Sequence, residues 1–425
     1  MYNLASSGDN HANSLSQDII IIMAKNKRPP PRKPSPEDKD EVITQLLCDL
    51  ALDLFEQEDS DEAGNSAVLR QKDTDFHKLI RKTLHQNKDE VLYDAIERTR
   101  FIDIGAYQYL RSNIEEASAT VLIRREGAPE MEIDAFVIPL FVHSNGGLKE
   151  ADDFQDQQAF EALVASFQQA ELESAKAKVV LIRHAYDLNE IDRITYCHLN
   201  EMVRDAWASM TEKKIVVTPG LERSLVGWAG NTFGAGDAAV ELRFLLGFAL
   251  KRADDAFYQV PQDEDAADAY FAARELRYQQ WTQQVTPLLQ RCLAPHGSGI
   301  ELNFLYQDLF HGGKERGMAE YFMLQMMSEI NHAMAQNKLA ADQVTAIVAP
   351  ADVQGDMVLR VNLYAMAGGA ALASSEKPLD LGADLEVEVD DICDALNTLG
   401  IASLSVALKF DVEGKAVEAL PYRPQ

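Results

Sequence analysis

The chain has 425 residues and a formal net charge of −28, from 68 acidic and 40 basic side chains. At ~100–200 residues per domain, this length predicts two or three domains. Hydrophobic residues make up 46% of the chain and charged residues 25%, as in ordinary globular proteins that bury a core. The negative charge disfavours a general binder of nucleic acid or anionic membranes, because both are polyanions.

The cysteines and the apolar runs predict the compartment. The chain has only four cysteines and no C-x-x-C pair, which disfavours a disulfide framework or a zinc knuckle and fits a reducing cytoplasm. The first apolar run, residues 19–23, is shorter than the ~7–15 residues of a signal-peptide core, and no stretch reaches the ~20 apolar residues of a membrane span. We therefore expect a soluble, cytoplasmic protein without a membrane contact, a metal or a cofactor.

Residues 1–36 are expected to form a disordered, basic, proline-rich leader. They hold five basic and two acidic residues, a net charge of +3 that leaves −31 on the rest of the chain. Either Met1 or Met23 is a plausible start. The leader is interpreted as a solubilising segment or, alternatively, as a contact to nucleic acid, the ribosome or an acidic partner. Its basic residues are Lys25, Lys27, Arg28, Arg32 and Lys33.

Residues 37–117 carry the pattern of a small helical region. Ser35 and Pro36 are typical of a helix start, as N-cap and first helical residue, and apolar residues then recur at helical spacing up to Leu54. An acidic, turn-rich loop follows at residues 56–66. Three further apolar stripes predict helices around residues 76–84, 92–96 and 110–117.

Two later segments share an order of predicted elements. Residues 118–212 form a first α/β unit, with strands at 120–124, 133–142 and 179–182, a helix at 160–167 before the third strand, and a further helix at 191–202. Residues 341–411 form a second unit, with strands at 344–348, 357–366 and 404–408 and a helix at 385–399 that Gly400 closes. Residues 412–425 are expected to be a C-terminal tail.

The two units suggest an internal duplication of one ββαβ motif. Each has a Gly-Gly pair after its second strand, and each has an aromatic residue followed by aspartate after its third, at Tyr186-Asp187 and Phe410-Asp411. Residue identity between the two segments is low, so coincidence is the alternative. The predicted fold class is α+β: a helical N-terminal region, two similar ββαβ units, and a mixed connecting region between them.

The connecting region, residues 213–340, gives a mixed pattern. Residues 240–250 fit a helix or a strand; if they form a strand, residues 253–255 are the turn of a hairpin that returns at residues 257–260. Helices are predicted at residues 261–294 and 316–336. The second of these is rich in methionine, which is typical of core packing and also of adaptable binding surfaces.

The string GNTFGAGDAA, residues 230–239, resembles the anion-hole motif of ribokinase-like sugar kinases. That resemblance implies a phosphotransferase in which Gly234, Ala235 and Gly236 hold the transferring phosphate and Asp237 is the catalytic base. The sugar-binding motif and the long α/β half that precede the string in that family are missing here. The alternative is a flexible glycine loop.

The string HGGKERG, residues 311–317, is a second candidate anion site. Lys314 and Arg316 lie just before a predicted helix N-terminus, where an anion is favoured; a surface loop is the alternative. Asp390 and Asp394 share a helix face, which we interpret as solvated rather than metal-binding. The three Gly-Gly pairs are predicted to be turns: Gly146-Gly147, Gly312-Gly313 and Gly368-Gly369.

Several strings in order resemble an uncharacterised family of bacterial proteins, typical of beta-proteobacteria, that is catalogued only as a domain of unknown function. The resemblance spans roughly residues 42–408, and it favours a strand at residues 240–250 over the kinase interpretation. The family has no established activity and implies no functional residues. The strings are ELRFLLGFAL, AFYQ, WTQQVTPLLQRCL, AIVAP, VLRVNLYAM and EVEVDDICDALNTLG.

These observations predict a non-enzymatic binding or interaction protein whose partner is a protein or a small molecule, and a homodimer is one arrangement that they allow. An enzyme without a local sequence motif is one alternative, because active sites assemble from distant residues. A nucleic-acid-associated or ribosome-associated protein that binds through the leader is another.

Overall fold

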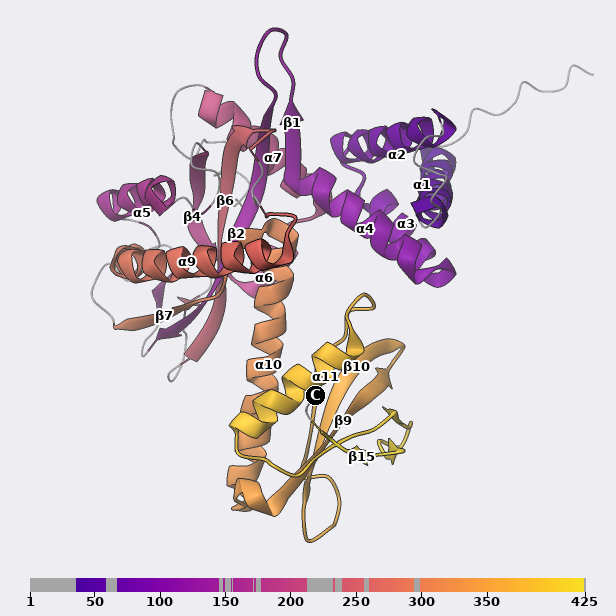
Figure 1. Cartoon of the computed structure of the whole chain (residues 1–425), viewed down its shortest axis with the longest axis vertical. Helices are drawn as coiled ribbons and strands as arrows, with labels where there is room; N and C mark the ends of the chain where they lie inside the picture. The colour runs from indigo at the N-terminus through magenta and orange to yellow at the C-terminus, as the bar shows by residue number, and fades with distance from the viewer. Residues whose placement is uncertain are drawn as a thin grey trace, which may run out of the picture.

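The computed structural model describes residues 36–58, 67–144, 148–149, 154, 156–170, 172, 177–211, 232–233, 239–255, 260–293 and 299–423. These residues form an α+β protein, which confirms the predicted class. A helical N-terminal region and a first sheet lie at one end of the molecule, and a second sheet lies at the other (Figure 1). The leader lies outside the described residues, apart from Pro36, which begins the first helix as predicted.

The N-terminal region contains helices α1 to α4, as the apolar stripes predicted. Their buried faces meet in a core of their own, which includes Leu47, Phe76 and Leu92. Helix α4 is capped by Asp103, whose carboxylate accepts a hydrogen bond from the Ala106 amide at 2.8 Å, and it runs directly into the first sheet. The bounds are α1 Pro36–Glu58, α2 Ala67–His85, α3 Asp89–Ile102 and α4 Ile104–Ala119.

The first sheet is built around one long strand, β2. One edge of β2 pairs with β6 along its whole length, and the other edge is shared in succession by β1, β8 and β7. Strand β4 pairs with the far side of β6, and every pairing in this sheet is antiparallel. The bounds are β1 Thr120–Ile123, β2 Met131–Ser144, β4 Lys178–Tyr186, β6 Ala239–Arg252, β7 Ile300–Phe304 and β8 Asp308–Leu309. A separate short pair joins β3 (Leu148–Lys149) and β5 (Thr232–Phe233).

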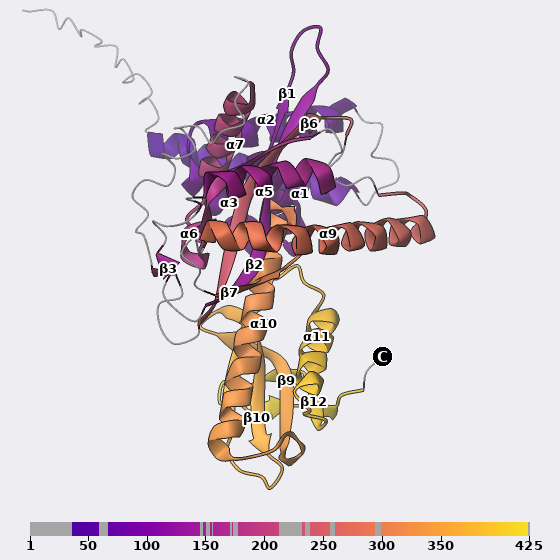
Figure 2. The ribbon, with the colours of Figure 1, turned by 90° about the vertical axis from the view of Figure 1, so that its left-hand side faces the viewer.

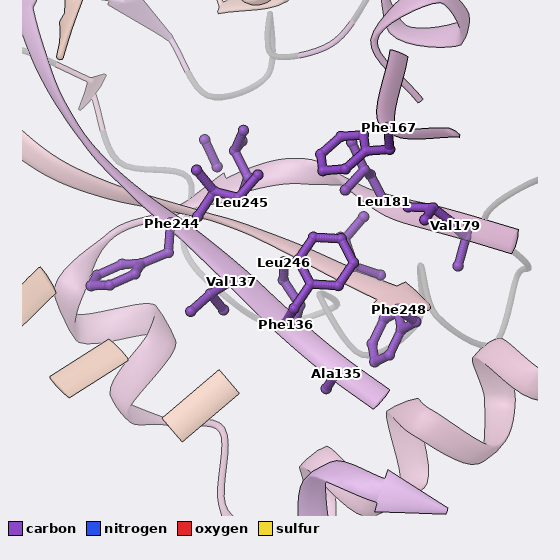
Figure 3. Packing of buried hydrophobic residues seen from close by; sticks show 14 of the residues in the cluster. Ala135, Phe136, Val137, Phe167, Val179, Leu181, Phe244, Leu245, Leu246 and Phe248 are labelled. Carbon is purple, nitrogen blue, oxygen red and sulfur yellow. The ribbon is translucent and has the colours of Figure 1, made fainter. Parts of the chain in front are cut away.

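Helices cover both faces of the first sheet. Phe136 of β2 meets Phe167 of α5 (Figure 3). Phe167 in turn meets Trp281 of α9, so these two helices cover one face. Helix α10 covers the other face, where Gly313 lies against Val137. The predicted helix at residues 191–202 is divided into α6 and α7. The bounds are α5 Gln157–Ala170, α6 Leu188–Asp192, α7 Tyr196–Thr211, α9 Glu264–Leu293 and α10 Phe310–Asn337.

The second sheet has the strand order β11-β10-β9-β12-β15. One face packs on α11 and the C-terminal half of α10, in a core that includes Ile330, Val361 and Ile392. The small pair β13–β14 adds Phe410 to a cluster with Ala349 of β9. The bounds are β9 Val344–Val353, β10 Asp356–Ala365, β11 Ala373–Pro378, α11 Leu385–Thr398, β12 Leu404–Val406, β13 Lys409–Phe410, β14 Ala416–Val417 and β15 Leu420–Pro421.

The structure corrects the idea of a duplicated ββαβ motif. In the second sheet, β12 pairs in parallel with β9, the first strand of its unit. In the first sheet, the equivalent strand β4 pairs with β6, which comes from the connecting region and separates β4 from β2. Chain order is therefore shared but strand pairing is not.

Two more of the predicted segments can be placed in the sheets. Residues 240–250, which fitted a helix or a strand, form a strand, and Ala253–Asp255 follow it in a turn. The predicted hairpin partner at residues 257–260 lies outside the described residues except for residue 260. The expected tail supplies β15, which extends the second sheet. No described helix combines the length and the apolar character that a membrane crossing requires.

Helix α10 joins the two sheets. Its N-terminal half lies on the first sheet, and Met326, Ile330 and Met334 in its C-terminal half belong to the second core. Figure 2 shows the helix running without a break from β2 down along β9 and β10. The helix that ends just before the expected boundary near residue 340 therefore contributes to both cores.

Replacing Gly317 with valine is expected to lower the free energy of unfolding by ~1 to 3 kcal/mol. A Cβ atom at this position would lie 2.8 Å from both Phe244 Cε1 and Pro139 Cβ, so α10 would have to move away from the first sheet. Urea unfolding measures the loss. The Ser328→Val variant adds the same side chain at an exposed position of α10 and should change the value by less than ~0.5 kcal/mol. Equal losses would contradict the close packing.

Candidate functional site

A cleft of about 870 Å³ opens between the helical N-terminal region and the second sheet. Its walls come from α4, from the N-terminal half of α10, from the β9–β10 turn and from β11 with the segment that precedes α11. Figure 1 shows α4 and β10 on the same side of α10. Ligand sites often lie where separate parts of a protein meet, so this cleft is the candidate site.

Arg111 of α4 connects three of these walls, namely α4, α10 and the segment that precedes α11. Its Nε atom lies 2.7 Å from Glu115 Oε1 and its Nη1 atom 2.9 Å from Asp380 Oδ2, while Nη2 contacts Glu315 of α10. Burial alone would lower the pKa of Arg111, but Glu115 and Asp380 outweigh it and hold the pKa above its ordinary value. The pKa of Glu115 is raised by burial, although Arg111 opposes the change. The guanidinium is thus fully used in positioning the walls.

A second ion pair lies in the wall of the cleft that β11 and α11 form. Lys377 of β11, whose side chain is 7% exposed, contacts Glu388 of α11. Like Arg111, this lysine is committed to a carboxylate of the protein itself. Both pairs therefore fix the shape of the cleft rather than leave a free charge for a ligand.

Apolar side chains and two loosely held arginines form the rest of the cleft. Met318, Phe322 and Met357 line it. Arg100 Nη1 is 3.6 Å from Glu97 Oε2, and the Arg316 guanidinium lies 6.0 Å from the centre of the Tyr306 ring. These long contacts are weak, so a ligand can replace them at little cost in free energy. The cleft can therefore accept a ligand that offers apolar groups beside a negative charge.

A neutral histidine lies beside the Arg111 cluster. His311 Nε2 is 2.9 Å from Ser118 Oγ, and the His311 ring is tilted against Tyr196 with centroids 5.6 Å apart. Burial, together with Lys314 and Arg111, lowers the pKa of His311 to about 3. Protonation of this ring would place a third cation next to Lys314 and Arg111, so it stays neutral at physiological pH.

The second predicted anion site takes a different form. Lys314 and Arg316 lie inside α10, which begins at Phe310, and not before a helix N-terminus. Lys314 Nζ pairs with Asp192 Oδ1 of α6 at 2.8 Å, whereas Arg316 faces the cleft. The expected turn at Gly312-Gly313 is wrong, since both residues are helical. Their missing side chains let α10 approach Val137 and Asp308.

The remaining predicted positions divide into two groups. Gly234, Ala235, Gly236 and Asp237 lie outside the described residues, and so does Gly146-Gly147. The element after the first of these segments is strand β6, so no helix N-terminus stands behind the proposed anion hole. Gly368 closes a turn, because its amide donates a hydrogen bond to the Ala365 carbonyl at 2.9 Å. Gly368 and Gly369 have positive φ angles of 86° and 128°. Within the described residues, no group of three or more His, Cys, Asp or Glu side chains is arranged to hold a metal.

Sequence reasoning missed the central residues of the cleft. Arg111 and Asp380 are 269 residues apart in the chain, and each belongs to a segment whose charges look like an ordinary solvated surface. The i, i+4 spacing of Arg111 and Glu115 was visible, but that spacing is typical of any exposed helix. No signal in a single sequence connects α4 to the segment before α11.

The fold and the cleft define an α+β protein with a ligand-sized opening between two of its parts. Comparisons with protein-family models, with curated proteins and with solved structures found no match. The resemblance to the beta-proteobacterial family therefore stays a prediction.

Proposed function

We propose that this chain is a non-enzymatic binding protein whose cleft takes a segment of a partner protein. The observation that carries the proposal is the cleft itself, in which the ion pairs of Arg111 and Lys377 fix the walls while Arg100 and Arg316 have only distant partners. The partner segment would place a carboxylate near these two arginines.

The apolar lining supports the same proposal. Methionine and aromatic side chains, together with arginine, are enriched at the centres of protein interfaces, and methionine adapts its shape to different partners. Met318, Phe322 and Met357 bring that combination to one cleft. Met326 and Met334 lie further along α10, where they pack in the second core. In the proposed function, the methionine-rich helix therefore provides both core packing and part of the binding surface.

Site-specific photo-crosslinking in the native host tests the proposal. A photoreactive residue replaces Phe322 in the cleft of the full-length chain, and the matched control replaces Phe271 of α9, which is 47% exposed and does not line the cleft. We expect one protein to crosslink from position 322 and not from position 271. The Arg316→Glu change should weaken the purified complex by ~30-fold, as for an interface arginine worth ~2 kcal/mol.

Two results would count against the proposal. The same set of proteins captured from both positions would indicate nonspecific collision. A partner that binds Arg316→Glu as tightly as the parent chain would place its contact outside the cleft.

A further inference from the structure

A smaller cavity of about 200 Å³ lies between the helical N-terminal region and the first sheet. Its walls come from α2, α4, β1 and the start of β2, and it shares no lining residue with the cleft. At ~30 Å³ per water molecule, it has room for roughly six or seven waters, or for an organic molecule with a similar number of heavy atoms.

One side of the cavity is backed by a buried charge cluster. The Lys251 side chain of β6 is 1% exposed; its Nζ atom contacts Glu132 and lies 2.9 Å from Asp134 Oδ2. Thr120 Oγ1 donates a hydrogen bond to Asp134 Oδ1 at 2.8 Å. Two carboxylates therefore face one ammonium, and of these residues Glu132 and Thr120 also line the cavity.

This side of the cavity has an excess of hydrogen-bond acceptors. Glu116 of α4 also lines it, and Glu116 forms no ion pair with another described residue. Burial raises the pKa of Glu132, and the negative charges of Asp134 and Glu116 raise it further, although Lys251 opposes them. A positively charged group between Glu116 and Glu132 would relieve this repulsion.

The α2 wall of the cavity carries hydrogen-bond donors. Arg81 and His77 of α2 line it. His77 Nε2 is 3.2 Å from Asp73 Oδ1, whereas Arg81 forms no ion pair with any described residue. The cavity thus offers acceptors from α4, β1 and β2, and from α2 a guanidinium without an ion pair to a described residue.

We propose that this cavity binds a free α-amino acid. The ammonium group would lie between Glu132 and Glu116 with Thr120 Oγ1 as a further acceptor, and the carboxylate would pair with Arg81. An ammonium group supplies three donors, which matches this set, and a guanidinium is well suited to a carboxylate. Lys251 cannot replace the ligand's ammonium group, because its own contacts go to Glu132 and Asp134.

Calorimetric titration of the full-length chain tests the proposal, with each of the twenty L-amino acids as a probe. Ethylamine and acetate are the comparison ligands, because each carries only one of the two charged groups. We expect at least one amino acid to bind at least ~10-fold more tightly than either comparison ligand. If none of the twenty gives a measurable heat, the proposal is overturned.

Variants of one residue from α2 and one from β2 test whether the amino acid binds in this cavity. Arg81→Gln and Glu132→Gln should each weaken binding of that amino acid by ~10-fold or more. Lys78→Gln, on the same helix as Arg81 and with a side chain that is 67% exposed, should leave binding unchanged. Arg81 is exposed, so its replacement reports on the ligand even if Glu132→Gln weakens the fold. Unchanged binding by Arg81→Gln would overturn the proposal.

Discussion

Replacing Lys251 with methionine is expected to lower the free energy of unfolding by ~3 to 5 kcal/mol. The lysine is almost fully buried and contacts Glu132 and Asp134, of which Asp134 is also buried. Burial lowers the pKa of Lys251, but Asp134 and Glu132 outweigh it, so the ammonium stays charged. Without that charge, two carboxylates would face each other in a region of low dielectric constant.

Urea unfolding at neutral pH measures this loss. The control is a triple variant, Lys251→Met with Glu132→Gln and Asp134→Asn, which removes all three charges and keeps similar side-chain volumes. It should recover a large part of the lost stability, because no charge is left unpaired. A loss of less than ~1 kcal/mol in the single variant would mean that water reaches the cluster.

The second large effect is a pH-dependent loss of stability that His311 causes. The pKa of His311 is about 3 in the folded chain, against ~6.5 for an ordinary histidine in the unfolded chain. The unfolded state therefore binds the proton more readily than the folded state. The contribution of the neutral ring to the free energy of unfolding is complete above pH ~6.5. That contribution is lost as the pH falls from 6.5 toward 3, and it amounts to ~3 kcal/mol between pH 7 and pH 4.

Comparison with His311→Gln isolates this contribution, because glutamine can keep a hydrogen bond to Ser118 but does not titrate. Urea unfolding of both chains at pH 7, 6, 5 and 4 gives the difference in free energy at each pH. The advantage of the parent chain should shrink as the pH falls, while the carboxylates of the two chains contribute equally. Parallel pH curves would show that the ring can accept a proton without cost.

Secondary structure was largely predictable from the sequence because it depends on local periodicity. The stripe that ends at Leu54 became α1, and the runs at residues 344–348 and 357–366 became β9 and β10. Gly400 ends α11 with a φ angle of 88°, a conformation that glycine adopts without strain. In each case the residues that determine the element are close together in the chain.

Strand pairing and the cleft were not predictable, because they depend on distant residues. Periodicity identified residues 240–250 as a possible strand but could not place it between β2 and β4, which made two different topologies look like a repeat. A Gly-Gly pair fits a turn and also a close helix contact, and Gly312-Gly313 belongs to the second kind. The Arg111–Asp380 contact leaves no trace in a single sequence.

Helix α10 determines how this gene can be divided for expression. At 1.5 Å per residue its 28 residues extend ~42 Å, far enough to serve as a structural wall of both sheets. A fragment that stops before Phe310 leaves the Val137 face of the first sheet open to water, and one that starts after Asn337 lacks a wall of the second. The predicted boundary near residue 340 is thus a poor place to begin a fragment for expression. A fragment that contains either sheet needs to include the entire helix.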